Sequence, residues 1–164
     1  MDVAGGHGLL ITTVLKANKA TRGILFDLPQ VTAGAAALLD EHGVAGRCEI
    51  VAGDFFVSVP EGADAYMMKH IIHDWDDERA IKILNSIYAA MPDDGKVLII
   101  ETVVPAGNEP HYSKVLDLEM LVSPGGLERT AEEYRELLAA AGLRLTRIIP
   151  TPSPYSIVEA VKAR

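Results

Sequence analysis

Short apolar runs alternate with helical patterns along the whole chain. The apolar runs indicate strands near residues 1–4, 22–26, 48–52, 64–68, 96–101, 144–149 and 156–162. Helical periodicity indicates helices at about 8–17, 30–42, 77–91, 113–122 and 130–141. This alternation predicts an α/β domain with a mostly parallel sheet and crossover helices.

The end of the chain departs from this alternation. The last two predicted strands are separated by Pro150-Thr151-Pro152-Ser153-Pro154, a loop too short for a crossover helix. Such strands pair antiparallel. We therefore expect a Rossmann-like, mostly parallel sheet of seven strands with a C-terminal antiparallel hairpin.

Several helix ends carry their own signals. Gly43, Gly95 and Gly142 each follow a helical stretch, where a left-handed C-cap favours glycine. Thr130, followed three residues later by Glu133, predicts a capping box at the start of the last helix.

Composition narrows the class of protein. The 164 residues suit one domain, spanning residues 1–164, and no apolar run approaches the roughly 20 residues that cross a bilayer. A net charge of −8 argues against a general nucleic-acid binder, which would carry a basic face. Cys48 stands alone, so neither a disulfide framework nor a zinc site is expected. We expect a cytoplasmic location, no membrane partner and no metal.

A glycine-rich segment, Asp2-Val3-Ala4-Gly5-Gly6-His7-Gly8, ends the first strand and opens the first helix. Glycines there allow a ligand close to the backbone, and the helix N-terminus offers free N–H groups. A dinucleotide fingerprint would need a third glycine where this chain has Leu9 or Ile11. The spacing fits Asp-x-Gly-x-Gly-x-Gly better, with Ala4 in the first glycine position.

Acidic residues follow the next two strands. Asp27 ends the second strand, where a carboxylate can accept hydrogen bonds from both hydroxyls of a ribose. Asp54 and Phe55 end the third, where they could hold an adenine amine and ring face. Singly, these residues could be a helix N-cap and a turn beside core aromatics. Together with the glycine loop they favour a nucleoside site.

The segment His70-Ile71-Ile72-His73-Asp74-Trp75 follows the fourth strand. The carboxyl end of a strand is where open α/β sheets bind ligands, and histidine titrates near neutrality. His73 is therefore a candidate general base, with Asp74 as a possible support. A lone histidine would more simply cap the strand. His70 is expected to be structural and to point elsewhere.

These motifs, taken in order with Lys69, Glu101 and Gly125-Gly126-Leu127-Glu128-Arg129-Thr130, resemble one known family. It is the catalytic domain of the S-adenosylmethionine-dependent O-methyltransferases of plant phenolics and bacterial aromatic natural products. The resemblance runs over essentially the whole chain. It implies a class I methyltransferase sheet and a small aromatic hydroxyl compound as acceptor.

The resemblance also implies roles for individual residues. Three groups hold S-adenosylmethionine: the loop at Ala4, Gly6 and Gly8 around its methionine part, Asp27 on the ribose, and Asp54 with Phe55 on the adenine, with Lys69 as a further contact. His73 would deprotonate the acceptor, with Glu101 and Glu128 flanking and orienting its imidazole. Glu101 in particular could accept from a ring nitrogen. Trp75 and Met120 would pack against the substrate.

Two departures from the family pattern stand out. Ala4 replaces a glycine, and we expect the family's N-terminal dimerisation domain, which closes the pocket, to be absent. Apolar residues of the helix around Met120 would then be bare and favour self-association or a homodimer; they are Leu116, Leu118, Met120, Leu121 and Val122. Two other functions stay open: a cofactor-retaining relative that decarboxylates or hydroxylates, and a non-catalytic fragment that binds S-adenosylmethionine.

Overall fold

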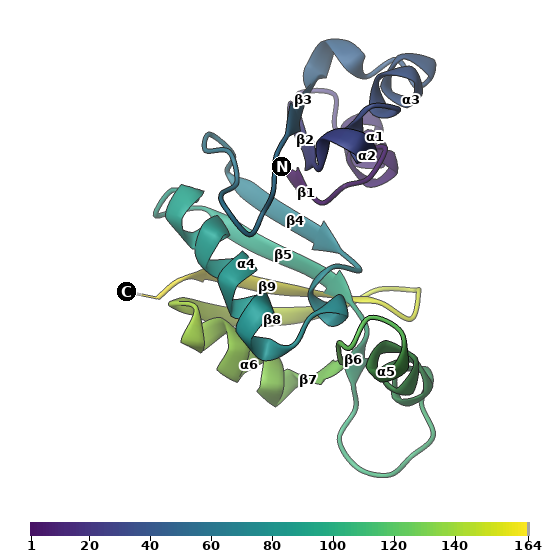
Figure 1. Cartoon of the computed structure of the whole chain (residues 1–164), viewed down its shortest axis with the longest axis vertical. Coiled ribbons are helices and arrows are strands. Elements are labelled where there is room, and N and C mark those ends of the chain that lie inside the picture. Colours follow the sequence, from purple (N-terminus) through teal and green to yellow (C-terminus); the bar gives the residue numbers. More distant parts are fainter. Residues whose placement is uncertain (164) are drawn as a thin grey trace.

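The strands of the chain form one main sheet in the computed structural model, which describes residues 1–163 (Figure 1). Its order is β3-β2-β1-β4-β5-β9-β8. The members are β1 (Asp2–Val3), β2 (Gly23–Asp27), β3 (Cys48–Ala52), β4 (Ala65–Lys69), β5 (Lys96–Glu101), β8 (Leu143–Pro150) and β9 (Ser156–Lys162). Strands β1 to β5 pair in parallel, whereas β9 pairs antiparallel with both β5 and β8. The predicted mostly parallel sheet with its antiparallel C-terminal hairpin is confirmed.

Helices cover both faces of this sheet. They are α1 (Leu9–Ala17), α2 (Pro29–Thr32), α3 (Ala35–Glu41), α4 (Asp77–Ala90), α5 (Tyr112–Val122) and α6 (Ala131–Ala140), with 3₁₀ turns η1 (Ala45–Arg47) and η2 (Ile72–Asp74). Helices α4 and α6 lie on one face, and α1 and α3 belong to a second core cluster. Because side chains alternate along a strand, Tyr66 and Met68 of β4 join the first cluster and Met67 joins the second.

Two predictions about helices need correction. The helix expected over residues 30–42 is two helices, since α2 ends at Thr32 and α3 begins only at Ala35. Gly34 lies between them, and a Cβ there would be 3.2 Å from the His7 ring. Gly95 is not a left-handed C-cap: α4 already ends at Ala90, before Pro92. The φ angles of Gly43 (66°) and Gly142 (73°) and the Thr130 capping box agree with prediction.

The sequence pattern missed a second, two-stranded sheet. Strands β6 (Val103–Val104) and β7 (Arg129–Thr130) pair in parallel, with Val103 opposite Arg129. This short pair lies beside α5, below the main sheet in Figure 1. The pairing holds the chain around β7, including the preceding Glu128, next to the residues that follow β5.

The parallel arrangement brings the candidate site residues to one edge of the sheet. Because β1, β2, β4 and β5 are parallel, their carboxyl ends lie at the same edge of the sheet, and the segments that follow them begin there. This is the edge at which such sheets bind ligands. Within the described part of the chain, no helix is long and apolar enough to cross a membrane.

Candidate active site

The backbone after β4 forms a tight turn around one carboxylate. His70 has a left-handed φ of 58° and is followed by η2, so successive N–H groups point inward. Glu101 Oε1 accepts hydrogen bonds from the N–H groups of Ile71 (3.0 Å), Ile72 (2.7 Å) and His73 (3.2 Å). Such a concavity of backbone N–H groups is an anion site, here occupied by a side chain of the same protein.

Glu101 therefore holds the turn that carries His73. Its side chain is fully buried, and Oε2 accepts a hydrogen bond of 2.6 Å from the Tyr134 hydroxyl of α6. Burial raises the pKa of Glu101, while the hydrogen bonds from Tyr134 and the turn oppose that rise. The expectation that Glu101 accepts from the imidazole is wrong, because its oxygens bond to Tyr134 and to backbone N–H groups, while the ring Nδ1 faces Glu128.

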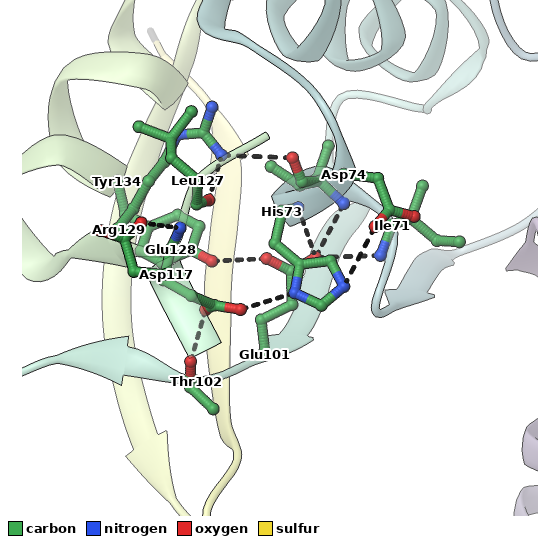
Figure 2. A network of polar contacts seen from close by, with 11 residues as sticks. Ile71, His73, Asp74, Glu101, Thr102, Asp117, Leu127, Glu128, Arg129 and Tyr134 are labelled. Atoms are coloured by element: carbon green, nitrogen blue, oxygen red, sulfur yellow. Dashed lines mark hydrogen bonds and ion pairs between the residues drawn. The ribbon is translucent and has the colours of Figure 1, made fainter. Parts of the chain in front are cut away.

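The carbonyl side of the same turn is held by a cation. Arg129 is 1% exposed, and its guanidinium donates to the carbonyl oxygens of Ile72 (3.2 Å) and Trp75 (3.0 Å). It also donates to Asp77 Oδ1 at 2.7 Å, at the start of α4. The turn thus lies between a carboxylate on its N–H groups and a guanidinium on its carbonyls (Figure 2).

The loop before β7 passes very close to the turn. Leu127 N–H donates to the His73 carbonyl at 2.9 Å. A Cβ on the preceding Gly126 would lie 1.9 Å from that same carbonyl oxygen. Only glycine allows this approach, which delivers Glu128 to the imidazole.

The His73 ring is oriented by Glu128. His73 Nδ1 lies 2.6 Å from Glu128 Oε1, and the Glu128 side chain has no exposed surface. The second oxygen, Oε2, accepts a hydrogen bond from the Thr102 hydroxyl, directly after β5. Because a carboxylate can only accept, we assign the ring hydrogen of neutral His73 to Nδ1. The lone pair then sits on Nε2, the ring nitrogen on the side of Asp74 in Figure 2.

The free ring nitrogen has an acidic neighbour. Asp74 Oδ1 lies 3.5 Å from His73 Nε2, and the Asp74 side chain is 41% exposed. Burial lowers the pKa of His73, but the hydrogen bond to Glu128 and the charges of Glu101, Glu128 and Asp74 outweigh it and raise the pKa above its usual value. The His70 ring centroid is 5.2 Å from that of His73, so His70 does not point elsewhere as expected.

The glycine loop has the backbone of a ligand cradle. Gly6 (φ 62°) and Gly8 (φ 91°) are left-handed, and so is Ala4 (φ 57°), the residue in the first glycine position. A Cβ on Gly6 would meet no atom within 4 Å, so the loop is open there. Gly6 N–H donates to Asp27 Oδ2 at 2.8 Å, which joins the loop to the end of β2.

One hollow adjoins this loop, and another lies near β3. The first, of about 320 Å³, lies between the end of β1, helix α1 and Lys69 of β4; it is lined by Asp2, Ala4, Gly5, Leu9, Leu10, Thr13 and Lys69. The other, of about 360 Å³, lies at the end of β3 and includes Gly53 and Asp54. Asp54 Oδ1 accepts a hydrogen bond of 2.8 Å from Phe56 N–H, which fixes the turn around it.

The predicted substrate residues have different surroundings. Trp75 packs edge-on against Phe55 (centroids 6.2 Å apart) and Phe56 (4.9 Å), so it lies beside a predicted adenine-binding residue. Met120 of α5 is 9% exposed, and its carbonyl accepts hydrogen bonds from Gly125 and Gly126. Met120 thus anchors the loop that carries Glu128.

Four polar residues of this site escaped the sequence analysis: Thr102, Asp117, Arg129 and Tyr134. Asp117 Oδ1 accepts a hydrogen bond of 2.8 Å from Glu128 N–H. Thr102 follows the predicted Glu101, and Arg129 follows the predicted Glu128. This proximity in sequence was the only signal that could have pointed to them. Nothing in the helical pattern of α6 singles out Tyr134. Among residues 1–163, no three His, Cys, Asp or Glu side chains gather to hold a metal, and the absence of a metal stays a prediction.

The chain matches a known family over most of its length. The model of the O-methyltransferase domain matches residues 1–144, so the chain belongs to this family. A phenazine O-methyltransferase of Lysobacter antibioticus is 49% identical over 160 residues, covering 98% of this chain and 47% of that protein. The mitomycin biosynthesis 6-O-methyltransferase of Streptomyces lavendulae is 42% identical over 165 residues, covering 99% and 47%.

A solved structure shows the same agreement. The O-methyltransferase from neocarzinostatin biosynthesis, in complex with S-adenosylmethionine and 2-hydroxy-5-methyl naphthoic acid, superposes with a TM-score of 0.90 at 38% identity. The match covers 99% of this chain and 48% of that one. The chain spans about half the length of the relatives it matches.

Proposed function

We propose that this chain, residues 1–164, is the catalytic domain of an S-adenosylmethionine-dependent O-methyltransferase acting on a hydroxyl group of a small aromatic compound. The observation that carries the proposal is the His73–Glu128 pair. A buried carboxylate 2.6 Å from Nδ1 leaves Nε2 as the ring nitrogen that can take a proton. Family membership supports the reaction class, and the phenazine and hydroxynaphthoic acid named for two relatives support an aromatic acceptor.

The residues around His73 suit general-base catalysis on a phenol. A phenol with a pKa of about 10 is mostly neutral at pH 7, and its oxygen becomes a much better nucleophile once the proton leaves. His73 Nε2 accepts that proton, and Glu128 and Asp74 stabilise the resulting imidazolium. Glu101 and Arg129 keep the backbone of His73 in place, so the base need not reorganise during the reaction.

The proposed cofactor residues suit S-adenosylmethionine in their chemistry and in the room around them. When bound, S-adenosylmethionine supplies an electrophilic methyl group on a positively charged sulfur. The open backbone at Gly6 and the hollow between α1 and Lys69 leave room for its methionine part, with Ala4 and Gly8 completing the loop. Each Asp27 oxygen already accepts one backbone N–H, from Gly6 or Leu28, and keeps a lone pair for a ribose hydroxyl. Asp54 and Phe55 would hold the adenine.

Substrate contacts and assembly extend the proposal. Trp75 and Met120 would line the acceptor pocket. Trp75 also packs against Phe55, which would hold the adenine. Self-association would proceed through α5, where Leu118, Leu121 and Val122 are 62%, 65% and 85% exposed. Leu116 and Met120 are each only 9% exposed, so they do not belong to that surface as expected. We place the protein in the cytoplasm.

A transfer assay tests the proposed function. The chain is incubated with S-adenosylmethionine labelled in its methyl group and with a panel of phenols that includes a hydroxyphenazine and a hydroxynaphthoic acid. We expect label in an aromatic methyl ether, and calorimetry should show binding of S-adenosylmethionine but not of NAD. Release of carbon dioxide or a hydroxylated product without methyl ether would indicate the decarboxylating or hydroxylating alternative. Cofactor binding without any product would indicate a non-catalytic fragment.

A further inference from the structure

The Glu128 carboxylate is shared between two partners on opposite sides. Oε1 faces His73 Nδ1 at 2.6 Å, and Oε2 accepts the hydrogen bond from the Thr102 hydroxyl. Thr102 is 1% exposed and follows β5 directly, and the β6–β7 pair brings it opposite Glu128. The hydroxyl thus meets the carboxylate in a region that water does not reach.

We propose that Thr102 is a positioning residue that acts through Glu128, fixing the carboxylate against the imidazole and limiting how strongly it draws a proton onto His73. The inference rests on the proposed function, in which His73 must be neutral to act as a base. A hydrogen bond to a carboxylate stabilises its charged form and spreads its charge. Without the hydroxyl, Oε2 would be buried without a partner, and the whole charge would be directed at the imidazolium.

The other charged groups around His73 are held by contacts that do not involve Thr102. Asp74 faces Nε2 from the same turn, and the His70 ring lies beside it. Glu101 at the end of β5 and Arg129 of β7 contact the backbone of the turn. Asp117 of α5 accepts from Glu128 N–H. None of these groups bonds to the Thr102 hydroxyl, so a change in His73 titration reports on the Thr102–Glu128 contact.

The decisive variants are Thr102→Val, which keeps the shape and removes the donor, and Thr102→Ser, which keeps the donor and removes a methyl group. Thr12→Val is the matched control, because Thr12 is 2% exposed and its hydroxyl finds no hydrogen-bond partner among residues 1–163. His73 is titrated by NMR in the full chain with ¹³C-labelled histidine, and the pH profile of methyl transfer is measured alongside.

We expect Thr102→Val to move the His73 midpoint upward by about one pH unit, the size of a hydrogen bond to a charged group. The acidic limb of methyl transfer should move by the same amount, with an approximately tenfold loss at pH 6.5 and little loss at high pH. Thr102→Ser and Thr12→Val should titrate like the wild type. Should Thr102→Val fail to fold, Thr102→Cys, with its weak thiol donor, should give a smaller upward movement.

An unchanged midpoint in Thr102→Val, or an equal movement in Thr102→Ser, would overturn the proposal. The NMR titration needs no turnover, so it tests the role of Thr102 separately from the reaction. Absence of methyl transfer by the wild type would reject the proposed function while the titration still decides whether Thr102 acts on His73.

Discussion

Glu101 bonds to the backbone N–H of His73 and not to its imidazole. Oε1 accepts that hydrogen bond at 3.2 Å together with two more from the same turn. Glu101 therefore fixes the position of the His73 backbone, while Glu128 fixes the orientation of the imidazole ring. Glu101 and Glu128 thus perform different tasks at His73.

Removing the Glu101 side chain should therefore act mainly by lowering the stability of the fold. Glu101→Ala leaves two buried N–H groups and one partly buried N–H group without an acceptor, and we expect a loss of about 3 kcal/mol or more in the free energy of unfolding. Glu101→Gln keeps an acceptor for the turn and should retain most of that stability. Urea denaturation compares the two; equal losses in both variants would mean that the charge, and not the acceptor, matters.

Gly126 should not tolerate a side chain. In Gly126→Ala the new Cβ would start 1.9 Å from the His73 carbonyl oxygen and would push the turn and the Glu128 loop apart. We expect a loss of stability of about 1–3 kcal/mol and a fall in turnover of roughly 100-fold, as a displacement near 1 Å produces. Gly46→Ala, where a Cβ meets no atom within 4 Å, is the control. Wild-type turnover in Gly126→Ala would contradict the close approach described above.

Ala4 is held in a conformation that suits glycine better. Its φ of 57° costs an alanine about 1–2 kcal/mol, so Ala4→Gly should raise the free energy of unfolding by about 1 kcal/mol. The same exchange at Ala37, an exposed position of α3, should lower it by about 1 kcal/mol. Thermal unfolding of both variants gives the comparison. Destabilisation by Ala4→Gly would mean that the loop does not strain Ala4.

The pKa of His73 predicts the pH dependence. Burial lowers that pKa, yet the Glu128 hydrogen bond and the charges of Glu101, Glu128 and Asp74 raise it overall, so the neutral ring predominates only above a pKa that exceeds the usual value of about 6.5. Turnover should rise with pH through a midpoint above that value. The stabilising effect of the charged ring is complete below about pH 6.5 and is lost as the pH rises through the folded-state pKa.

Asp74→Asn removes one of those charges from an exposed side chain 3.5 Å from Nε2. Its midpoint should be lower than that of the wild type, with the stability little changed. A pH–rate profile for both proteins checks this. Equal midpoints would refute the contribution of Asp74, and a wild-type midpoint at or below about 6.5 would refute the raised pKa of His73.

Much of this architecture can be predicted from the sequence because periodicity and turn residues act locally. The strands and the antiparallel hairpin follow from apolar runs and from the proline-rich loop before β9. The places of the glycine loop and of Asp27 were predictable, because the loop follows β1 directly and Asp27 is the last residue of β2. The break between α2 and α3 was not, because the helical pattern continues through Gly34 and the His7 ring near it comes from a distant loop.

The contacts of the candidate site were less predictable, because they depend on backbone geometry that spacing does not encode. The left-handed backbone of His70 turns three N–H groups toward Glu101, and no residue pattern predicts a positive φ at a histidine. Two-residue strands such as β6 and β7 have no periodicity, so nothing in the sequence indicated their pairing or the Thr102–Glu128 contact next to it. Tyr134 meets Glu101 only through the packing of α6 on the sheet.

The central claim is that His73 is the general base, and its most direct test is the turnover of His73→Ala with a phenolic acceptor. His73→Ala is compared, at a saturating concentration of S-adenosylmethionine, with the wild type and with His42→Ala. His42 follows the end of α3 and lies away from the site. We predict a fall of about 10²–10⁴-fold in His73→Ala alone, the range typical of a lost general base, with cofactor affinity unchanged. Wild-type turnover in His73→Ala would contradict the account, because positioning of the acceptor alone would then suffice.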